Sequence, residues 1–530
     1  MLNRRRIYDI VCIAVCLVIT GILFIYLGRD KRVVFCDEIY SYTITNSDKA
    51  TYQFETGRIY SRNEVEDMLS HTEGDSILKM LKNVAEDKVH PPVYYIFMYI
   101  SSVVLGGYSK WIGLSVNLFF LLGIVILIWK FIYQITGSRI SAILSVGVYL
   151  LNTSTLSDMM LIRMYMAMTF FTMLLVYYES IIENEEKTKK FYPGLMLITA
   201  SGFLTQYYFA FFAIAFFIVE FAFNMKKDRL RVKAYFLSLL AGVGVATAVW
   251  PLWIPSMVLN SHAGAIARSA IDFLHMFKKA LEGFRILQVA IFQKAYIFGI
   301  FFIVILSVAY FVSPLIRIKR GKARKLVMKL LTAAFIYAVL VRILTPDYLT
   351  SGRYYYPAQM LEIISILIMI YSLIAEYISG YKDITFIAAC VILIVGDYIG
   401  YRYGYGIDYY GDAVVYDEQM EILQKYSDGL WIMTDNHVYE FDAMMAFWCI
   451  PEYLVVLDQN TDEPVKYSNG NEFDGVDETI IVSIEHMTDY GMTDNSDSGL
   501  YYIIGSTGRF ATDELLLRNG NVLIYRAQLQ

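Results

Sequence analysis

Two adjacent carboxylates follow the first hydrophobic segment, in the stretch Cys36-Asp37-Glu38-Ile39-Tyr40-Ser41. They lie about eight residues past the end of an apolar run, where a membrane helix would return to water. A carboxylate at such a boundary can act as a general base towards a hydroxyl or an amine, or it can hold a divalent cation. The alternative is an ordinary pair of solvated loop charges. Asp37 and Glu38 are therefore candidate catalytic residues.

Two arginines could bind an anion. Arg163 in Met160-Leu161-Ile162-Arg163-Met164-Tyr165 is near the end of an apolar run, where a charge is costly and often functional. The alternative is an arginine that reaches the lipid headgroups. Arg353 in Ser351-Gly352-Arg353-Tyr354-Tyr355-Tyr356-Pro357 has a forked guanidinium that could bind phosphate. Here the alternative is an interfacial belt of aromatic side chains.

His90 and Asp158 are weaker candidates. His90 in His90-Pro91-Pro92-Val93-Tyr94-Tyr95 could orient a carboxylate, bind a metal or contact phosphate, but it could equally mark the entry to a helix. Asp158 is five residues before Arg163 and could pair with it. A single histidine does not make a zinc site, and no other metal-ligand spacing stands out in the sequence.

Composition indicates a membrane protein with a soluble tail. The 530 residues are 57% hydrophobic, with a mean hydropathy of +0.46. A soluble protein could not bury that much apolar surface. Residues 403–530 carry 23 acidic and 5 basic side chains, a net charge of −18, so residues 1–402 carry +13 of the total of −5. The basic excess lies in short loops between apolar runs, which favours membrane topology over nucleic-acid binding.

Apolar length and loop charge predict the topology. Spans need about 20 residues, and basic loops face the cytoplasm. Placing every basic cluster inside predicts eleven crossings, an inner N-terminus and an outer tail. It also makes the 14-residue apolar run 92–105 a juxtamembrane or re-entrant helix rather than a crossing. The expected spans are 10–28, 111–133, 140–152, 157–180, 191–204, 207–223, 234–254, 290–316, 328–345, 357–378 and 383–401.

The acidic tail has the pattern of a small α/β domain. Strand-like apolar runs occur at 430–433, 453–457, 479–484, 501–504 and 522–525, with helical stretches at 415–426 and 437–448. Alternating strands and helices favour a largely parallel sheet. The expected domains are therefore 1–402 in the membrane, with a first outer loop at 29–91, and 403–530 outside.

The order of these motifs resembles one family. An Asp-Glu pair after the first helix is followed by His-Pro-Pro-x-Tyr-Tyr, Arg-Met-Tyr, Thr-Gln-Tyr-Tyr at 205–208 and Arg-Tyr-x-x-Pro at 353–357. This order, over about residues 1–400, resembles the GT-C membrane glycosyltransferases, in particular the branch that contains protein O-mannosyltransferases and bacterial aminoarabinose transferases.

The resemblance implies an inverting transfer of a hexosyl or pentosyl group from a polyprenyl-phosphate donor at the outer face of the plasma membrane. It puts Asp37 at the acidic catalytic position, with Glu38 beside it. It also implies that the donor phosphate and sugar are bound by His90, Arg163, Tyr165, Arg353 and Tyr354. The expected partners are the lipid-linked sugar, membrane lipids and an acceptor that the sequence does not specify.

Two departures from the family pattern leave metal dependence open. Leu161 and Ile162 stand where an acidic residue often precedes the Arg-x-Tyr pair, and Gln206 stands where histidine is common. Both changes remove groups that could contact a metal or a phosphate. A divalent ion held by Asp37 and Asp158 therefore remains an alternative to a metal-free site.

Two other functions fit the same composition. A transporter or flippase of lipid-linked sugars would carry ionisable residues at mid-membrane and often shows repeated halves, and neither is seen in the sequence. An inert membrane anchor whose acidic tail binds a partner would make the motif order a coincidence.

Overall fold

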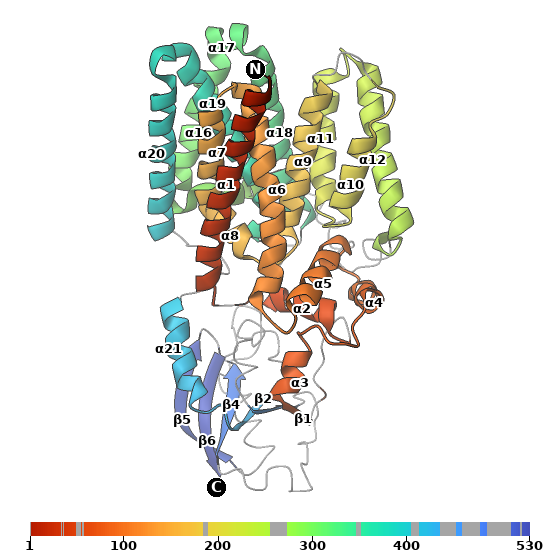
Figure 1. The fold of residues 1–530 in the computed structure, drawn as a ribbon, viewed down its shortest axis with the longest axis vertical. Coiled ribbons are helices and arrows are strands. Elements are labelled where there is room, and N and C mark those ends of the chain that lie inside the picture. The colour runs from red at the N-terminus through yellow and green to blue at the C-terminus, as the bar shows by residue number, and fades with distance from the viewer. Residues whose placement is uncertain are drawn as a thin grey trace. The chain divides into compact units, whose positions relative to one another are not determined.

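The chain folds into two compact units (Figure 1). The first comprises Met1–Gly28, Lys88–Phe97 and Leu114–Asp408, and the second comprises Arg29–Asp87, Met98–Gly113 and Tyr409–Gln530. The computed structural model describes residues 2–32, 34, 36–48, 55, 58–183, 189–254, 273–345, 351–403, 413–434, 452–457, 478–484, 510–519 and 522–529.

The first unit is a helical bundle, built from long apolar stretches. Pro193 and Pro357 stand in the first turns of α10 and α19, where a missing N–H costs no helical hydrogen bond. The helices are α1 (Leu2–Asp30), α6 (Lys110–Thr136), α7 (Arg139–Leu151), α8 (Thr153–Met160), α9 (Tyr165–Glu183), α10 (Pro193–Phe203), α11 (Phe209–Asn224), α12 (Arg229–Val249), α15 (Phe273–Phe292), α16 (Tyr296–Val312), α17 (Pro314–Lys319), α18 (Gly321–Leu344), α19 (Tyr356–Tyr377) and α20 (Lys382–Tyr403).

Many of these helices could cross a membrane. Within the described residues, eight helical segments are long and apolar enough, or nine if α7 and α8, which meet at 66°, form one bent span. The apolar helices α5 (Val93–Leu105), α10 and α11 are shorter than a normal span. The expected number of eleven crossings therefore stays a prediction, and it requires α10 and α11 to cross.

One expected span is interrupted. The sequence predicts a single apolar span over 157–180, but α8 ends at Met160 and α9 begins at Tyr165. The side chain of Asn117 on α6 donates to the carbonyls of Met159 and Leu161, at 3.1 and 2.6 Å. These bonds satisfy carbonyls that the ended helix leaves open. The break puts Arg163 in a connection rather than in a helix.

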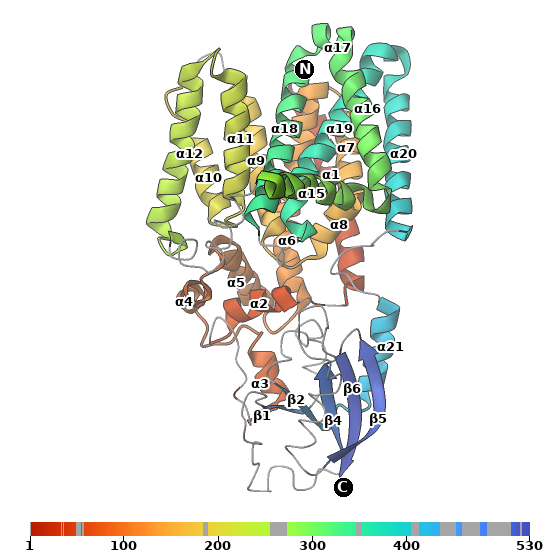
Figure 2. The same cartoon turned by 180° about the vertical axis from the view of Figure 1, so that it is seen from behind.

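Helix α15 lies crosswise to α16 and α18 (Figure 2). It approaches α18 closely at Gly283, where a Cβ atom would be 2.8 Å from the carbonyl oxygen of Ala338. Arg342 of α18 pairs with Glu282 at 2.6 Å. Only a glycine permits this close crossing, so Gly283 allows α15 to pack directly against α18.

A network of buried charges joins four helices of the bundle. Lys329 of α18 lies 3.0 Å from Glu179 of α9 and 2.8 Å from Glu220 of α11. Arg231 of α12 contacts the same two carboxylates, each at 2.9 Å. Arg231 lies in the first turn of α12, which begins at Arg229, and its side chain turns into the bundle.

The second unit contains the helices α2 (Cys36–Asn46), α3 (Arg62–Asp67), α4 (Ile77–Asp87) and α21 (Ala413–Gln424), and a six-stranded sheet in the order β1-β3-β2-β4-β6-β5. The strands are β1 (Ile59–Ser61), β2 (Leu430–Thr434), β3 (Tyr453–Leu457), β4 (Glu478–Ile484), β5 (Phe510–Asn519) and β6 (Val522–Leu529).

This sheet is mixed rather than largely parallel. β2 pairs in parallel with β3 and β4, whereas the β1–β3, β4–β6 and β5–β6 pairs are antiparallel. The expected order missed β1, which comes from the first loop, and β5, whose charges obscure the strand pattern. The expected strand 501–504 and helix 437–448 lie outside the described residues. Because β1 pairs with β3, residues 29–87 group with the tail.

Candidate functional site

The carboxylates Asp37 and Glu38 stand in the first turn of α2, in the second unit. The partial positive charge at a helix N-terminus favours anionic side chains there. Glu38 is fully buried and pairs with Lys31 at 3.1 Å, whereas Asp37 is partly exposed. Burial lowers the pKa of Lys31, and the nearby Glu38 carboxylate partly opposes this effect. Of the two carboxylates, Asp37 is therefore the more accessible one.

Helix α2 is anchored along its length within the second unit. The hydroxyl of Tyr42 donates to the carbonyl of Ser109 at 3.0 Å. Asn46 donates to the carbonyl of Leu69 at 2.6 Å, and Asn83 of α4 donates to the carbonyl of Ile44 at 3.2 Å. These buried bonds hold the helix that presents Asp37.

His90 and Arg163 meet in the first unit. Nη2 of Arg163 lies 2.7 Å from Nε2 of His90, and only 3% of the surface of Arg163 is exposed. Because a guanidinium is a donor, this contact requires an unprotonated His90 Nε2 that accepts. The two residues are 73 positions apart, and the fold brings them together.

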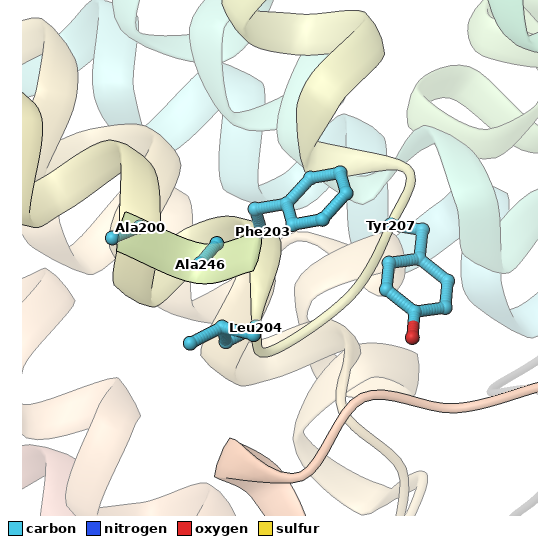
Figure 3. Packing of buried hydrophobic residues seen from close by; sticks show 5 residues of the cluster. All are labelled: Ala200, Phe203, Leu204, Tyr207 and Ala246. Atoms are coloured by element: carbon cyan, nitrogen blue, oxygen red, sulfur yellow. The ribbon is translucent and has the colours of Figure 1, made fainter. Parts of the chain in front are cut away.

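The segment that carries His90 is held in place by contacts with the end of α10. The N–H of Val93 donates to the carbonyl of Leu204 at 2.9 Å. Figure 3 shows the side chains at this end of α10, and Val93 packs against the same group. The group consists of Ala200, Phe203, Leu204, Tyr207 and Ala246. Apolar packing and one backbone bond thus position the segment that carries His90.

Arg353 lies beside tyrosines from two segments. Its guanidinium carbon is 5.7 Å from the ring centre of Tyr165 and 5.4 Å from that of Tyr354, within the range of cation–π attraction. The rings of Tyr165 and Tyr354 meet edge to face at 5.6 Å. Tyr165 follows Arg163 by two residues, so the arginines and their tyrosines form one cluster. We call His90, Arg163, Tyr165, Arg353 and Tyr354 the arginine–tyrosine cluster.

Tyr208 also belongs to this site, although the sequence predicted no function for it. Its ring stacks on that of Tyr354 at 4.5 Å, and its hydroxyl lies 3.0 Å from Oγ1 of Thr345. Burial, and then the neighbouring Tyr354, raise the pKa of Tyr208 above its usual value. In the sequence, its place in the Thr-Gln-Tyr-Tyr motif indicates that it could belong to the site. Tyr337, which carried no such signal, donates to the carbonyl of Tyr354 at 2.7 Å.

Asp158 does not pair with Arg163. It is buried on α8, where its Oδ2 accepts from Oγ1 of Thr169 at 3.2 Å. Asp158 belongs to the first unit and Asp37 to the second. Among the described residues, no group of three or more His, Cys, Asp or Glu side chains could hold a metal ion. A divalent ion held by Asp37 and Asp158 stays a prediction.

Comparisons with known proteins identify the fold. No protein-family model and no curated protein matches the sequence. The chain aligns with the crystal structure of ArnT, an aminoarabinose transferase, from Cupriavidus metallidurans bound to undecaprenyl phosphate. The TM-score is 0.51 and the sequence identity 11%, over 98% of each chain. This chain has the GT-C fold.

A second GT-C structure also aligns, an oligosaccharyltransferase from Archaeoglobus fulgidus in complex with Zn and sulfate. Its TM-score is 0.45 at 11% identity, over 96% of this chain and 72% of that one. The alignment with ArnT confirms the GT-C fold expected from the sequence, and the long apolar helices confirm the expected multi-pass membrane character. The roles of individual residues within the GT-C fold stay predictions.

Proposed function

We propose that the protein is an inverting glycosyltransferase that moves a sugar from a polyprenyl-phosphate donor to an extracytoplasmic acceptor. The observation that carries the proposal is the arginine–tyrosine cluster on a GT-C fold. Two guanidiniums and an imidazole gather there beside aromatic rings. Cations suit a phosphate, and aromatic faces suit a sugar ring or an isoprenoid chain.

In this reaction the acceptor oxygen or nitrogen attacks the anomeric carbon while the bond from that carbon to the phosphate oxygen breaks. Asp37 takes the acceptor proton as the general base. The electron pair of the breaking bond leaves with the phosphate, whose charge Arg163 and Arg353 stabilise. Since a phosphate leaves more readily than a sugar alkoxide, no separate acid is needed, unlike in glycosidases with two carboxylates.

Glu38 supports Asp37 rather than reacting itself. Its carboxylate is fully buried and paired with Lys31, so an acceptor would have to displace an ion pair to reach it. A buried pair holds its backbone firmly, and Asp37 is the adjacent residue in the same helical turn.

The proposed enzyme lies in the plasma membrane with its N-terminus in the cytoplasm and its C-terminal domain outside. Eleven crossings follow if the short helices α10 and α11 also span, and the basic connections then all face inward. The donor chain would lie in the membrane, next to apolar helices. The sugar is a hexosyl or pentosyl group, and the acceptor a glycan, lipid or protein of the cell envelope.

The test of the base is Asp37→Asn, which keeps the shape of the side chain and removes its basicity. We expect transfer from a polyprenyl-phosphate sugar to fall about 100-fold or more, because a positioned base contributes about 10²–10⁴-fold. Asp48→Asn is the matched control. Asp48 is exposed in the same unit, where a pairing with Lys79 lowers its pKa, and its substitution should leave transfer nearly unchanged. Near-normal activity of Asp37→Asn in correctly folded protein would overturn the assignment.

One observation favours a second function, a transporter or flippase of lipid-linked sugars. Charged side chains inside a membrane bundle mark ion pathways in many transporters, and the Glu179–Lys329 network is such a group. A reconstituted protein that moves the lipid-linked sugar across a vesicle bilayer, yet transfers no sugar, would favour this alternative.

A further inference from the structure

A polar cavity lies at the end of the bundle that carries α17. Its volume is about 920 Å³. Five basic side chains and two carboxylates line it, which gives the wall a net charge of +3. The basic side chains are Arg231, Lys319, Arg320, Lys322 and Lys325.

This cavity is remote from the arginine–tyrosine cluster. Helix α18 begins beside the cavity at Gly321, and it ends at Leu344, next to the Thr345 that contacts Tyr208. At about 1.5 Å per residue, its 24 residues separate the two places by roughly 35 Å. Both views place α17 and α8 at opposite ends of the bundle (Figures 1 and 2). The cavity is therefore separate from the arginine–tyrosine cluster.

The carboxylates in the wall do not neutralise all of its cations. Lys325 pairs with Glu183 at 2.6 Å. Glu376 is shared, since Arg320 approaches it at 2.7 Å and Lys319 at 3.3 Å. Lys322 is exposed and makes no ion pair within the described part of the chain. The wall thus keeps at least one cation available for an anion.

The start of α18 adds hydrogen-bond donors to this wall. Arg320 is the N-cap residue, and no side chain caps the helix there. The first N–H groups of a helix lack intrahelical partners and carry partial positive charge, so they attract anions. Gly321 leaves open space beside these groups, because a Cβ atom there would meet nothing within 4 Å.

Apolar side chains flank the same corner. Val312 at the end of α16 is 74% exposed, and Ile318 on α17 is 79% exposed. Leu326 of α18 lines the cavity itself. A phosphate that carries hydrocarbon chains could therefore place its head in the cavity and its chains against these residues.

We propose that this cavity binds the phosphate headgroup of an anionic phospholipid through Lys322, Arg320 and the start of α18. Basic pockets between membrane helices on the cytoplasmic side recognise such headgroups. Bound there, the lipid links α17, α18 and the end of α19, which Glu376 already joins to Arg320. This role is independent of the proposed glycosyl transfer.

The experiment measures binding and thermal stabilisation of the full-length protein in nanodiscs. Discs of phosphatidylcholine alone are compared with discs that contain phosphatidylglycerol, and inorganic phosphate is added to the neutral discs in a separate arm. We expect phosphatidylglycerol to raise the unfolding midpoint of the wild type. Lys322→Glu should weaken this binding about fivefold or more, because each basic side chain near an anionic headgroup contributes about a fivefold factor and the substitution also adds a negative charge.

Arg317→Glu is the matched control, with the same charge change at an exposed residue of α17 that does not line the cavity. Phosphatidylglycerol should raise the unfolding midpoint of the Arg317→Glu variant as much as it raises that of the wild type. Stabilisation by inorganic phosphate that only Lys322→Glu abolishes would support the anion site and identify a soluble phosphate compound as the occupant. Equal loss in both variants would indicate general attraction of a basic surface and overturn the proposal, as would no effect of either anion.

Discussion

Arg353 is the residue whose geometry most directly suggests phosphate binding. Its guanidinium lies close to the rings of Tyr165 and Tyr354, and these contacts limit its orientation. A fixed, charged fork suits a phosphate oxygen pair better than a flexible ammonium does.

Arg353→Lys keeps the charge and loses the fork, so it isolates the role of geometry. We expect kcat/KM for the lipid donor to fall about 10-fold or more, which corresponds to about 1.4 kcal/mol. The KM of the acceptor should change little. Arg402→Lys on α20, an exposed residue, is the control. An equally weakened use of the donor and of the acceptor would contradict a role of Arg353 in phosphate binding.

The buried Lys31–Glu38 pair separates a reacting carboxylate from a supporting one. Glu38→Gln should destabilise the protein by about 3–5 kcal/mol, because it leaves Lys31 buried without its counter-charge. The double variant Lys31→Met with Glu38→Leu should recover most of that stability, as judged by the unfolding midpoint in detergent.

Activity of the double variant then decides the role of Glu38. A supporting residue permits partial transfer once the helix is stable again, whereas a reacting carboxylate does not. Transfer that stays absent in a double variant of wild-type stability would therefore return Glu38 to the catalytic group.

At the scale of elements, the charge network of α9, α11, α12 and α18 determines how the bundle closes at one end. Glu179 and Glu220 each form salt bridges with both Lys329 and Arg231. Such a network makes the register of these helices specific, since a shift by one residue would leave charges unpaired in an apolar surrounding.

Lys329→Met should destabilise the bundle strongly, by about 3–5 kcal/mol, because two carboxylates lose a buried partner. Adding Glu220→Gln should restore part of the loss, and the measurement is the thermal midpoint of purified protein. Lys382→Met at the start of α20 serves as a control outside the network. Additive losses in the double variant would show that the two residues do not stabilise each other.

At the scale of the whole molecule, the fold constrains the topology. The first loop contributes β1 to the sheet of the tail, where it pairs with β3, so the loop and the tail must lie on the same side of the membrane. This requirement agrees with the topology that loop charges predict.

Single-cysteine labelling tests that topology. In a cysteine-free background, Asp48→Cys in the first loop should react with a membrane-impermeant thiol reagent in intact cells. Lys322→Cys at the start of α18 should react only after the membrane is opened. Both native side chains are exposed, so access depends on the side of the membrane. Labelling of the first loop only in opened cells would contradict the glycosyltransferase topology.

The sequence by itself determined the class of the protein. Apolar runs of membrane length and a GT-C motif order predicted a polytopic GT-C protein, because spans are local in sequence and hydrophobicity reports them directly. The same reasoning located His90, Arg163, Tyr165, Arg353 and Tyr354, whose residue types suit a phosphate.

Only the tertiary structure decided which of these side chains touch. The Arg163–His90 contact joins residues 73 positions apart, Asn117 of another helix donates to carbonyls at the break before Arg163, and β1 pairs with a strand almost 400 residues later. Glu38 looks like a solvated charge in the sequence, yet it is buried against Lys31, and Arg231 pairs with carboxylates of two other helices. Such partners come from distant segments, and a local pattern contains no information about which segments will meet.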